Sequence, residues 1–200
     1  MPIRHLDVTT WYLEQREPAD LRPARREPEV PVDIVRAEVP SPELSRFLYT
    51  AVGGDWYWVD RLAWSYDQWR NWLGRPGVET WIAHVRGTPA GYVELDPQAD
   101  GEVEIVCFGL LPAFHGRGVG GHLLATGAAR AWDLAERWPA RKPTSRVWLH
   151  TCSNDGPAAL GNYQARGFRV YDTKVETEAV GHTPPGPWPG ARPPGRLTRP

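Results

Sequence analysis

The stretch that decides the fold is VEIVCFGLLPAFHGRGVGGHLL, residues 103–124. It begins with strand-forming residues and ends with the apolar spacing of a helix. Between the two lies a turn containing Gly116, Gly118, Gly120 and Gly121. This order leaves backbone N–H groups free at a helix N-terminus, where roughly half a positive charge collects. The turn therefore predicts an anion site with a diphosphate as its natural ligand; a tight turn that serves packing alone is the alternative.

Two other phosphate-binding motifs do not fit this turn. A nucleoside-triphosphate loop would end in Gly-Lys-Ser/Thr, which the sequence lacks here. A dinucleotide fingerprint would need a parallel unit and an acidic residue about 20 positions on. The strands before the turn are instead predicted to be antiparallel, and the expected position falls at residues 138–142, WPARK.

Composition places the chain among single-domain proteins with a sizeable core. It has 200 residues, a formal net charge of −1 and 41% hydrophobic residues. No apolar run reaches the roughly 18 residues of a membrane span, and the N-terminus has no signal-peptide core. The near-neutral net charge gives no reason to expect a surface that binds nucleic acid. Two cysteines are too few for a disulfide framework, and no Cys/His cluster has the spacing of a zinc site. We therefore expect a cytoplasmic protein with no metal, no membrane contact and no nucleic-acid partner.

Periodicity and turn residues outline an α/β order of elements. Residues 14–31 are charged and broken by Pro, which is typical of a surface loop. Residues 1–180 are expected to form one domain, with residues 1–30 as an N-terminal strand and charged loop. The Pro/Gly-rich residues 181–200 are predicted to be a disordered or extended tail. The strands are predicted at 8–13, 32–39, 78–85, 90–95, 103–111, 146–151 and 168–175, and the helices at 41–54, 65–73, 117–138 and 157–166.

Two motifs in this order resemble the GNAT acetyltransferase superfamily. His115-Gly-Arg-Gly-Val-Gly, after Leu110-Leu-Pro, is similar to the family's coenzyme A signature Gln/Arg-x-x-Gly-x-Gly/Ala. Residues 158–168, AALGNYQARGF, resemble its closing Ala/Leu-x-x-Tyr-x-x-x-Gly-Phe segment. His115 departs from the usual Gln or Arg, which affects one side-chain contact and leaves the backbone cradle intact. The resemblance implies an α/β fold with a central, mostly antiparallel sheet, a splayed parallel strand pair and flanking helices.

The resemblance also implies an acyltransferase activity. We expect an N-acetyltransferase that moves an acetyl group from acetyl-CoA to a primary amine of a small molecule, by direct attack in a ternary complex. The alternatives are a protein N-terminal or lysine acetyltransferase, and a coenzyme A-binding sensor without turnover. The expectation is compatible with a homodimer.

The chemistry requires a base, an oxyanion donor and an acid, because an amine with a pKa near ~10 is protonated at neutral pH. The resemblance assigns the base to Glu104, in a Glu-Ile-Val like that of the histone-acetylating branch, with Glu102 and His150 as alternatives. It assigns the general acid to Tyr163 and the oxyanion donor to the N–H of Leu110.

The coenzyme-binding residues follow from the same resemblance. They line the strand before the turn, the turn itself and the segment after the next strand. The expected residues are Phe108, Leu110, His115, Gly116, Arg117, Gly118, Val119, Gly120, Gly121, Asn154 and Tyr163.

Eleven Trp residues are an unusual excess, and many of them fall within residues 56–72 beside several acidic residues. Helical spacing explains part of this group as a core-facing stripe. Trp56, Trp58 and Trp64 are not explained in this way. We expect them, with His150, to line the acceptor site, where aromatic rings would receive a cationic or ring-bearing amine.

Overall fold

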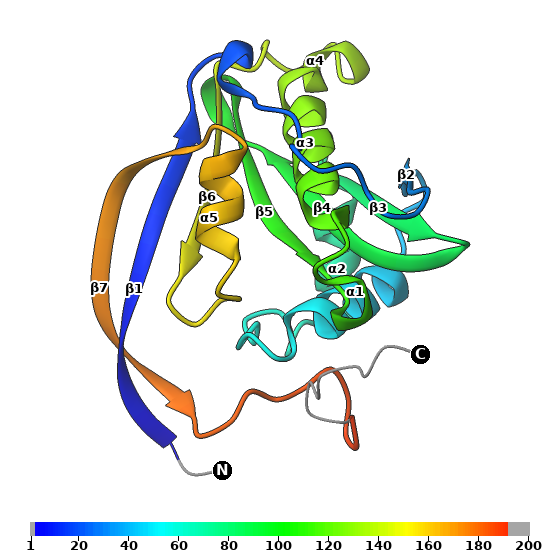
Figure 1. Cartoon of the computed structure of the whole chain (residues 1–200). Helices are drawn as coiled ribbons and strands as arrows, with labels where there is room; N and C mark the ends of the chain where they lie inside the picture. Colours follow the sequence, from blue (N-terminus) through cyan, green and yellow to red (C-terminus); the bar gives the residue numbers. More distant parts are fainter. Residues whose placement is uncertain (1–2, 192–200) are drawn as a thin grey trace.

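A seven-stranded mixed sheet forms the centre of the molecule, in the strand order β2-β3-β4-β5-β6-β1-β7 (Figure 1). The computed structural model describes residues 3–191. The strands are β1 (Ile3–Gln15), β2 (Asp33–Arg36), β3 (Glu79–Val85), β4 (Thr88–Pro97), β5 (Glu102–Leu110), β6 (Arg146–Cys152) and β7 (Arg169–Gly181). The helices are α1 (Pro42–Gly53), α2 (Tyr66–Leu73), α3 (Val119–Trp132), α4 (Leu134–Arg137) and α5 (Ala159–Ala165), with short 3-10 turns at Pro18–Asp20, Ala99–Gly101 and Pro112–Phe114.

The first two helices begin where their capping residues predict. The Ser41 hydroxyl accepts a hydrogen bond from the N–H of Leu44, and Pro42 occupies the first turn. Ser65 and Gln68 form a capping box at the start of α2. Local chemistry thus fixes the position of both helices in the sequence.

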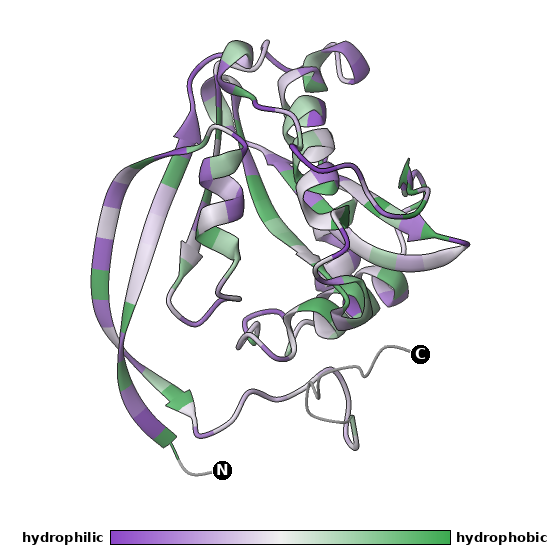
Figure 2. Cartoon of the chain, viewed as in Figure 1, coloured by the Kyte–Doolittle hydropathy of each residue, from purple (hydrophilic) through white to green (hydrophobic). Residues whose placement is uncertain are grey.

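The helices divide between the two faces of the sheet. Helices α1 and α2 cover β3–β5 on one face through a cluster that includes Leu48, Val52 and Trp69. Helix α3 packs on the other face, over β3–β6, through Leu123 and Leu124. Figure 2 shows hydrophobic residues along the central strands, whereas hydrophilic and hydrophobic residues alternate along the exposed edge strand β7. The core thus consists of two clusters, one between the sheet and each helical layer.

Strands β5 and β6 are parallel and diverge. Their register joins Glu102–Glu104 to Arg146–Trp148, and beyond these pairs the strands separate toward their C-terminal ends (Figure 1). The other neighbouring strands are antiparallel. The expected fold class, a mostly antiparallel sheet with a splayed parallel pair and flanking helices, is confirmed.

The N-terminal strand occupies a position that the sequence does not reveal. β1 is longer than the predicted 8–13 and lies between β6 and β7, antiparallel to both. Strand β7, predicted at 168–175, continues to Gly181 because β1 pairs with it as far as Ile3. Since β2 lies at the opposite edge, residues 16–32 must cross the sheet. This crossing loop runs over the α3 face, where the N–H of Glu29 donates to the carbonyl of Arg117 (Figure 1).

Two further segments differ in detail from the expected pattern. The helix predicted at 117–138 is divided at Asp133, whose backbone leaves helical geometry while its carboxylate accepts hydrogen bonds from Arg130 and Arg137. Residues 182–191 contain bends and turns, and the N–H of Gly186 donates to the carbonyl of Gly54. The rest of the predicted tail lies outside the described residues. None of the helices within residues 3–191 is long and apolar enough to cross a membrane.

Candidate active site

The glycine turn after β5 presents the start of α3 without side chains. Gly116 and Gly118 have φ of 74° and 81°, in the left-handed region that favours glycine, and Gly118 is the N-cap of α3. A Cβ at Gly118 would lie 2.8 Å from the carbonyl oxygen of Glu27 in the crossing loop. The first N–H groups of α3 have no partners within the helix, so the turn can receive an anion.

His115 has a structural contact of its own in this turn. Its Nε2 lies 3.0 Å from the carbonyl oxygen of Leu110, so the imidazole joins the end of β5 to the turn. Of the neighbouring predicted residues, Arg117 is exposed, and Val119 is fully buried in the core. His115, in place of the usual Gln or Arg, is thus compatible with an intact turn.

The space between the diverging strands brings together the predicted residues Phe108 and Tyr163. Their rings form an edge-to-face pair with centroids 5.8 Å apart. Tyr163 is 6% exposed, and burial raises the pKa of its phenol. The hydroxyl therefore stays protonated at neutral pH and can serve as a proton donor. Asn154 lies in the loop between β6 and α5, at the open end of the same space.

Glu104 and His150 meet on the opposite face of the sheet, the face of α1 and α2. His150 Nδ1 lies 3.5 Å from Glu104 Oε1, and Gln98 Nε2 donates to Glu104 Oε2 at 2.7 Å. The Glu104 carboxylate raises the pKa of His150. The other alternative base, Glu102, accepts two hydrogen bonds of 3.2 Å from Arg146. The structure thus brings together two of the three candidate bases and pairs the third elsewhere.

Aromatic residues surround His150 from neighbouring strands. The ring centroid of Tyr12 lies 5.9 Å from that of His150, and the ring of Trp148 lies at 6.4 Å. Sequence reasoning missed Tyr12, because the register Tyr12↔His150 joins residues from opposite ends of the chain. Alternation along the predicted strand 146–151 was the one signal that could have placed Trp148 on the same face as His150.

Most of the clustered Trp residues surround an arginine of the chain itself. Arg61 is 7% exposed, with its guanidinium 4.7 Å from the ring of Trp64 and 4.4 Å from that of Trp72. Its Nη1 donates to Glu94 at 2.7 Å. The structure therefore places Trp64, one of the expected acceptor residues, against an internal cation.

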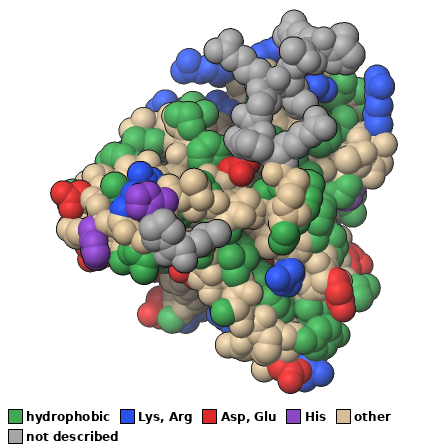
Figure 3. All heavy atoms as spheres, turned by 90° about the horizontal axis from the view of Figure 1, so that it is seen from below, with side chains coloured by type: hydrophobic (Ala, Val, Ile, Leu, Met, Phe, Trp, Pro, Cys, Tyr) green, Lys and Arg blue, Asp and Glu red, His purple; other side chains and the backbone are tan. Residues whose placement is uncertain are grey.

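The other two predicted aromatic residues reach the open end of the splay. Trp58 Nε1 donates to Asp155 Oδ1 at 3.4 Å, and a Cβ at Gly156 would lie 3.4 Å from the ring of Trp56. Both contacts join the loop between α1 and α2 to the loop between β6 and α5. Seen from below, this end of the molecule shows acidic and basic side chains scattered among apolar ones (Figure 3). A surface hollow of about 310 Å³ lies elsewhere, between residues 97–103 and 140–144.

Comparison with known families identifies the class of protein. The family model described as "Acetyltransferase (GNAT) family" matches residues 45–168, more than half of the chain. The chain therefore belongs to the GNAT acetyltransferase family, as the two motifs predict. Enzymes of this family generally use acetyl-CoA. The match begins after β1 and the crossing loop.

Solved structures show the same fold at low sequence identity. A GCN5-related N-acetyltransferase from Kribbella flavida aligns with 90% of this chain and 60% of its own, with 18% identity and a TM-score of 0.60. One from Sphaerobacter thermophilus aligns with 88% of this chain and 53% of its own, with 18% identity and a TM-score of 0.55. An aminoglycoside acetyltransferase from a soil metagenomic sample covers 68% and 86%, with 11% identity and a TM-score of 0.51. The chain thus spans about 60% or less of the first two relatives, and comparison with curated proteins finds no match.

Proposed function

We propose that this protein is an acetyl-CoA-dependent N-acetyltransferase that acts on a primary amine of a small molecule. One observation carries the proposal: the glycine turn lies on the α3 side of the sheet, and the Glu104–His150 pair lies on the other face, at the point where β5 and β6 stop pairing. The coenzyme would enter from the α3 side and the amine from the α1–α2 side. Direct attack in a ternary complex needs this two-sided arrangement, because both ligands must be bound at once.

The residues on the α3 side fit a coenzyme with a diphosphate and a narrow arm. The N–H groups of residues 116–121 would bind the diphosphate, while Phe108 and Asn154 would line the arm. When bound, acetyl-CoA supplies the acetyl thioester. The N–H of Leu110, at the end of β5, would donate to the thioester carbonyl oxygen as negative charge develops there.

His150 is the better placed of the two paired residues to remove the amine proton. At roughly 3.3 Å per residue, Glu104 lies about 13 Å along β5 from Phe108, so it needs an intermediary. His150 lies two residues beyond Trp148, the partner of Glu104, and hence nearer the open end. With Nδ1 turned toward Glu104, Nε2 is free to accept the proton, and the carboxylate stabilises the imidazolium. The 3.5 Å separation is of the kind that shortens on substrate binding.

Tyr163 would supply the proton that the leaving thiolate needs. The phenol carries its proton at neutral pH, and the thiolate would take that proton as the C–S bond breaks. Its position next to Phe108 places it on the coenzyme side of the splay. The base and the acid would thus act from opposite faces.

The acceptor side favours a small amine over a peptide. Contacts of Trp56 and Trp58 with residues 155–156 bridge the two loops at the open end. The carboxylates of Glu104 and Asp155 would attract an ammonium group before its proton is removed. The soil aminoglycoside acetyltransferase that shares the fold supports this choice by analogy only.

Thiol release from acetyl-CoA, measured across a panel of small amines and peptides, tests the proposal. His150→Gln and Glu104→Gln should each lower turnover by about 10²–10⁴-fold while leaving coenzyme affinity unchanged. Glu102→Gln is the matched control. It removes a carboxylate from the same strand, but this carboxylate is paired with Arg146, so the variant should retain activity. Faster acetylation of peptides than of any small amine would indicate a protein acetyltransferase. Coenzyme binding without release for any acceptor would indicate a sensor.

If Glu104→Gln abolishes turnover while His150→Gln retains it, the base is Glu104 acting through a water. If both variants retain full turnover, neither residue is the base, and the assignment of this face as the acceptor side fails.

A further inference from the structure

Arg166, at the end of α5, is a buried cation without an anion. It is 5% exposed, and its Nε has no hydrogen-bond partner. Among residues 3–191 no carboxylate forms an ion pair with its guanidinium. Burial and the charge of Arg25 lower the pKa of Arg166. Proteins rarely bury an unpaired charge, because removing it from water is unfavourable.

The guanidinium of Arg166 faces the first turn of α3. A Cβ at Gly121 would lie 2.5 Å from Arg166 Nη1 and 3.7 Å from Asn162 Oδ1. Gly121 therefore leaves the space that the guanidinium occupies. Arg166 thus lies beside the helix N-terminus whose free N–H groups attract an anion, and the two features point to the same ligand.

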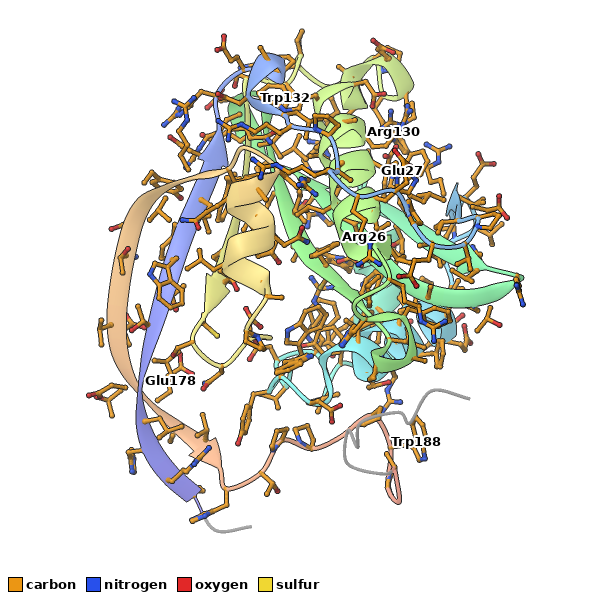
Figure 4. All side chains as sticks on the ribbon, viewed as in Figure 1. Arg26, Glu27, Arg130, Trp132, Glu178 and Trp188 are labelled. Atoms are coloured by element: carbon orange, nitrogen blue, oxygen red, sulfur yellow. The ribbon has the colours of Figure 1, made fainter. Side chains whose placement is uncertain are left out.

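The crossing loop closes around this point from the other side. A Cβ at Gly121 would lie 3.6 Å from the Cβ of Ala24, and the N–H of Arg22 donates to the carbonyl of Arg166. Arg26 Nη1 donates to the carbonyl of Gly116 at 3.3 Å. Figure 4 shows Arg26 and Glu27 on the loop in front of α3.

Several charged side chains of the crossing loop form ion pairs. Arg26 forms an ion pair with Glu29, and Asp20 forms one with Arg169. Arg25 is exposed and directly follows Ala24, whose Cβ lies against Gly121 beside the Arg166 guanidinium, and its charge lowers the pKa of Arg166. Two like charges held close together are stabilised when an anion lies between them.

We propose that Arg166 and Arg25 form a second phosphate-binding element of the coenzyme site, opposite the glycine turn, with the crossing loop as its outer wall. The inference rests on the proposed function, since it assigns the anion to the phosphate groups of coenzyme A. The guanidinium groups would donate charge-assisted hydrogen bonds to phosphate oxygens, while the turn supplies backbone N–H groups. Arg166 lies within the matched family segment, residues 45–168, whereas Arg25 and the crossing loop precede it.

Calorimetric binding of coenzyme A to the full chain tests this assignment. Arg166→Met should weaken coenzyme A binding by about tenfold to a hundredfold, and Arg25→Gln should weaken it less, because Arg25 is exposed. Pantetheine, which has no phosphate, should bind equally to all three proteins. Arg46→Gln removes an exposed arginine from α1, changes the net charge equally, and should leave coenzyme A binding unchanged.

Thermal unfolding separates a binding role from a structural one. Without coenzyme, Arg166→Met should unfold at the same temperature as the wild type or higher, because an unpaired buried charge is removed. With coenzyme A, its stabilisation should be smaller than that of the wild type. A lower melting temperature without coenzyme, combined with unchanged coenzyme A affinity, would show that Arg166 is structural and would overturn the proposal.

3′-Dephospho-coenzyme A identifies the phosphate that is bound. If Arg166→Met weakens its binding as much as that of coenzyme A, Arg166 contacts the diphosphate. If the variant binds it as well as the wild type does, Arg166 contacts the 3′-phosphate; both results support the proposal. Equal losses for pantetheine and coenzyme A would refute it. If coenzyme A binds but no amine is acetylated, the proposed function alone fails, whereas a wild type that binds no coenzyme A refutes both.

Discussion

Replacing Arg61 by Met removes the cation at the centre of the Trp cluster. Its guanidinium lies against the rings of Trp64 and Trp72 and donates to Glu94, which is 1% exposed. In Arg61→Met, Glu94 keeps the indole N–H of Trp72, at 2.9 Å, as a neutral donor. The variant thus leaves a carboxylate buried without its counter-charge.

The expected loss of stability is large. Removing one partner of a buried ion pair costs about 3–5 kcal/mol, a substantial part of the roughly 5–15 kcal/mol that stabilises a domain. For a chain of this size, each kcal/mol shifts the melting temperature by about 2–4 °C, so a fall of about 6–20 °C is expected. The cation–π contacts add to this loss, because Met offers the rings no charge.

Urea unfolding followed by Trp fluorescence measures this loss, and a double variant tests its cause. Arg61→Met/Glu94→Gln should recover most of the stability, because it removes the unpaired charge and leaves a side chain of similar volume. The coupling energy from the four proteins should be at least about 2 kcal/mol. Additive losses, or a loss below about 1 kcal/mol in Arg61→Met, would refute an essential buried pair.

Three further changes have defined outcomes. With the neutral form of His150 as the proposed base, kcat/KM for the amine should rise with pH through a midpoint above the ordinary value of about 6.5. Glu104→Gln should lower that midpoint, and an unchanged midpoint would contradict the pairing. Tyr163→Phe should slow the chemical step about 10²-fold or more in single-turnover measurements, whereas full activity would assign the acid to another group. Gly118→Ala should destabilise the fold by more than the roughly 1–2 kcal/mol of left-handed strain, because its Cβ would also contact the crossing loop. Gly87→Ala is the control, because Gly87 also has a positive φ of 80°, but among the described residues no atom lies within 4 Å of its Cβ position. Equal losses of stability in the two variants would rule out a contribution of the loop contact.

The parts of the fold that follow from local signals could be predicted. The Ser41 cap, the glycines after β5 and the alternation along the central strands depend on neighbouring residues, so the sequence alone shows them. The order of strand, glycine turn and helix was enough to predict an anion site at the start of α3, which becomes the coenzyme side of the proposed site. It needed no knowledge of the rest of the chain.

The remaining parts depend on contacts between distant residues. The insertion of β1 beside β6 follows from pairing across the whole chain, which no local pattern encodes. For the same reason the pairing of Glu104 with His150 could not be read from either strand alone and required the sheet register. The contact of Trp64 with Arg61 could not be predicted, because Arg61 looks like any surface arginine in sequence.

The position of β1 explains how the sheet can remain open at its centre. A splayed strand loses hydrogen bonds on one side, and β6 pairs with β5 only over Arg146–Trp148. On its other side β6 pairs with Thr10–Gln15 of β1, so its backbone is held as far as Cys152 while the space next to β5 stays free. Because the chain then has to return to β2 at the far edge, the crossing loop must pass over the α3 face, where it contacts the glycine turn. The same N-terminal segment therefore holds one wall of the splay and carries Arg25 to the proposed coenzyme site.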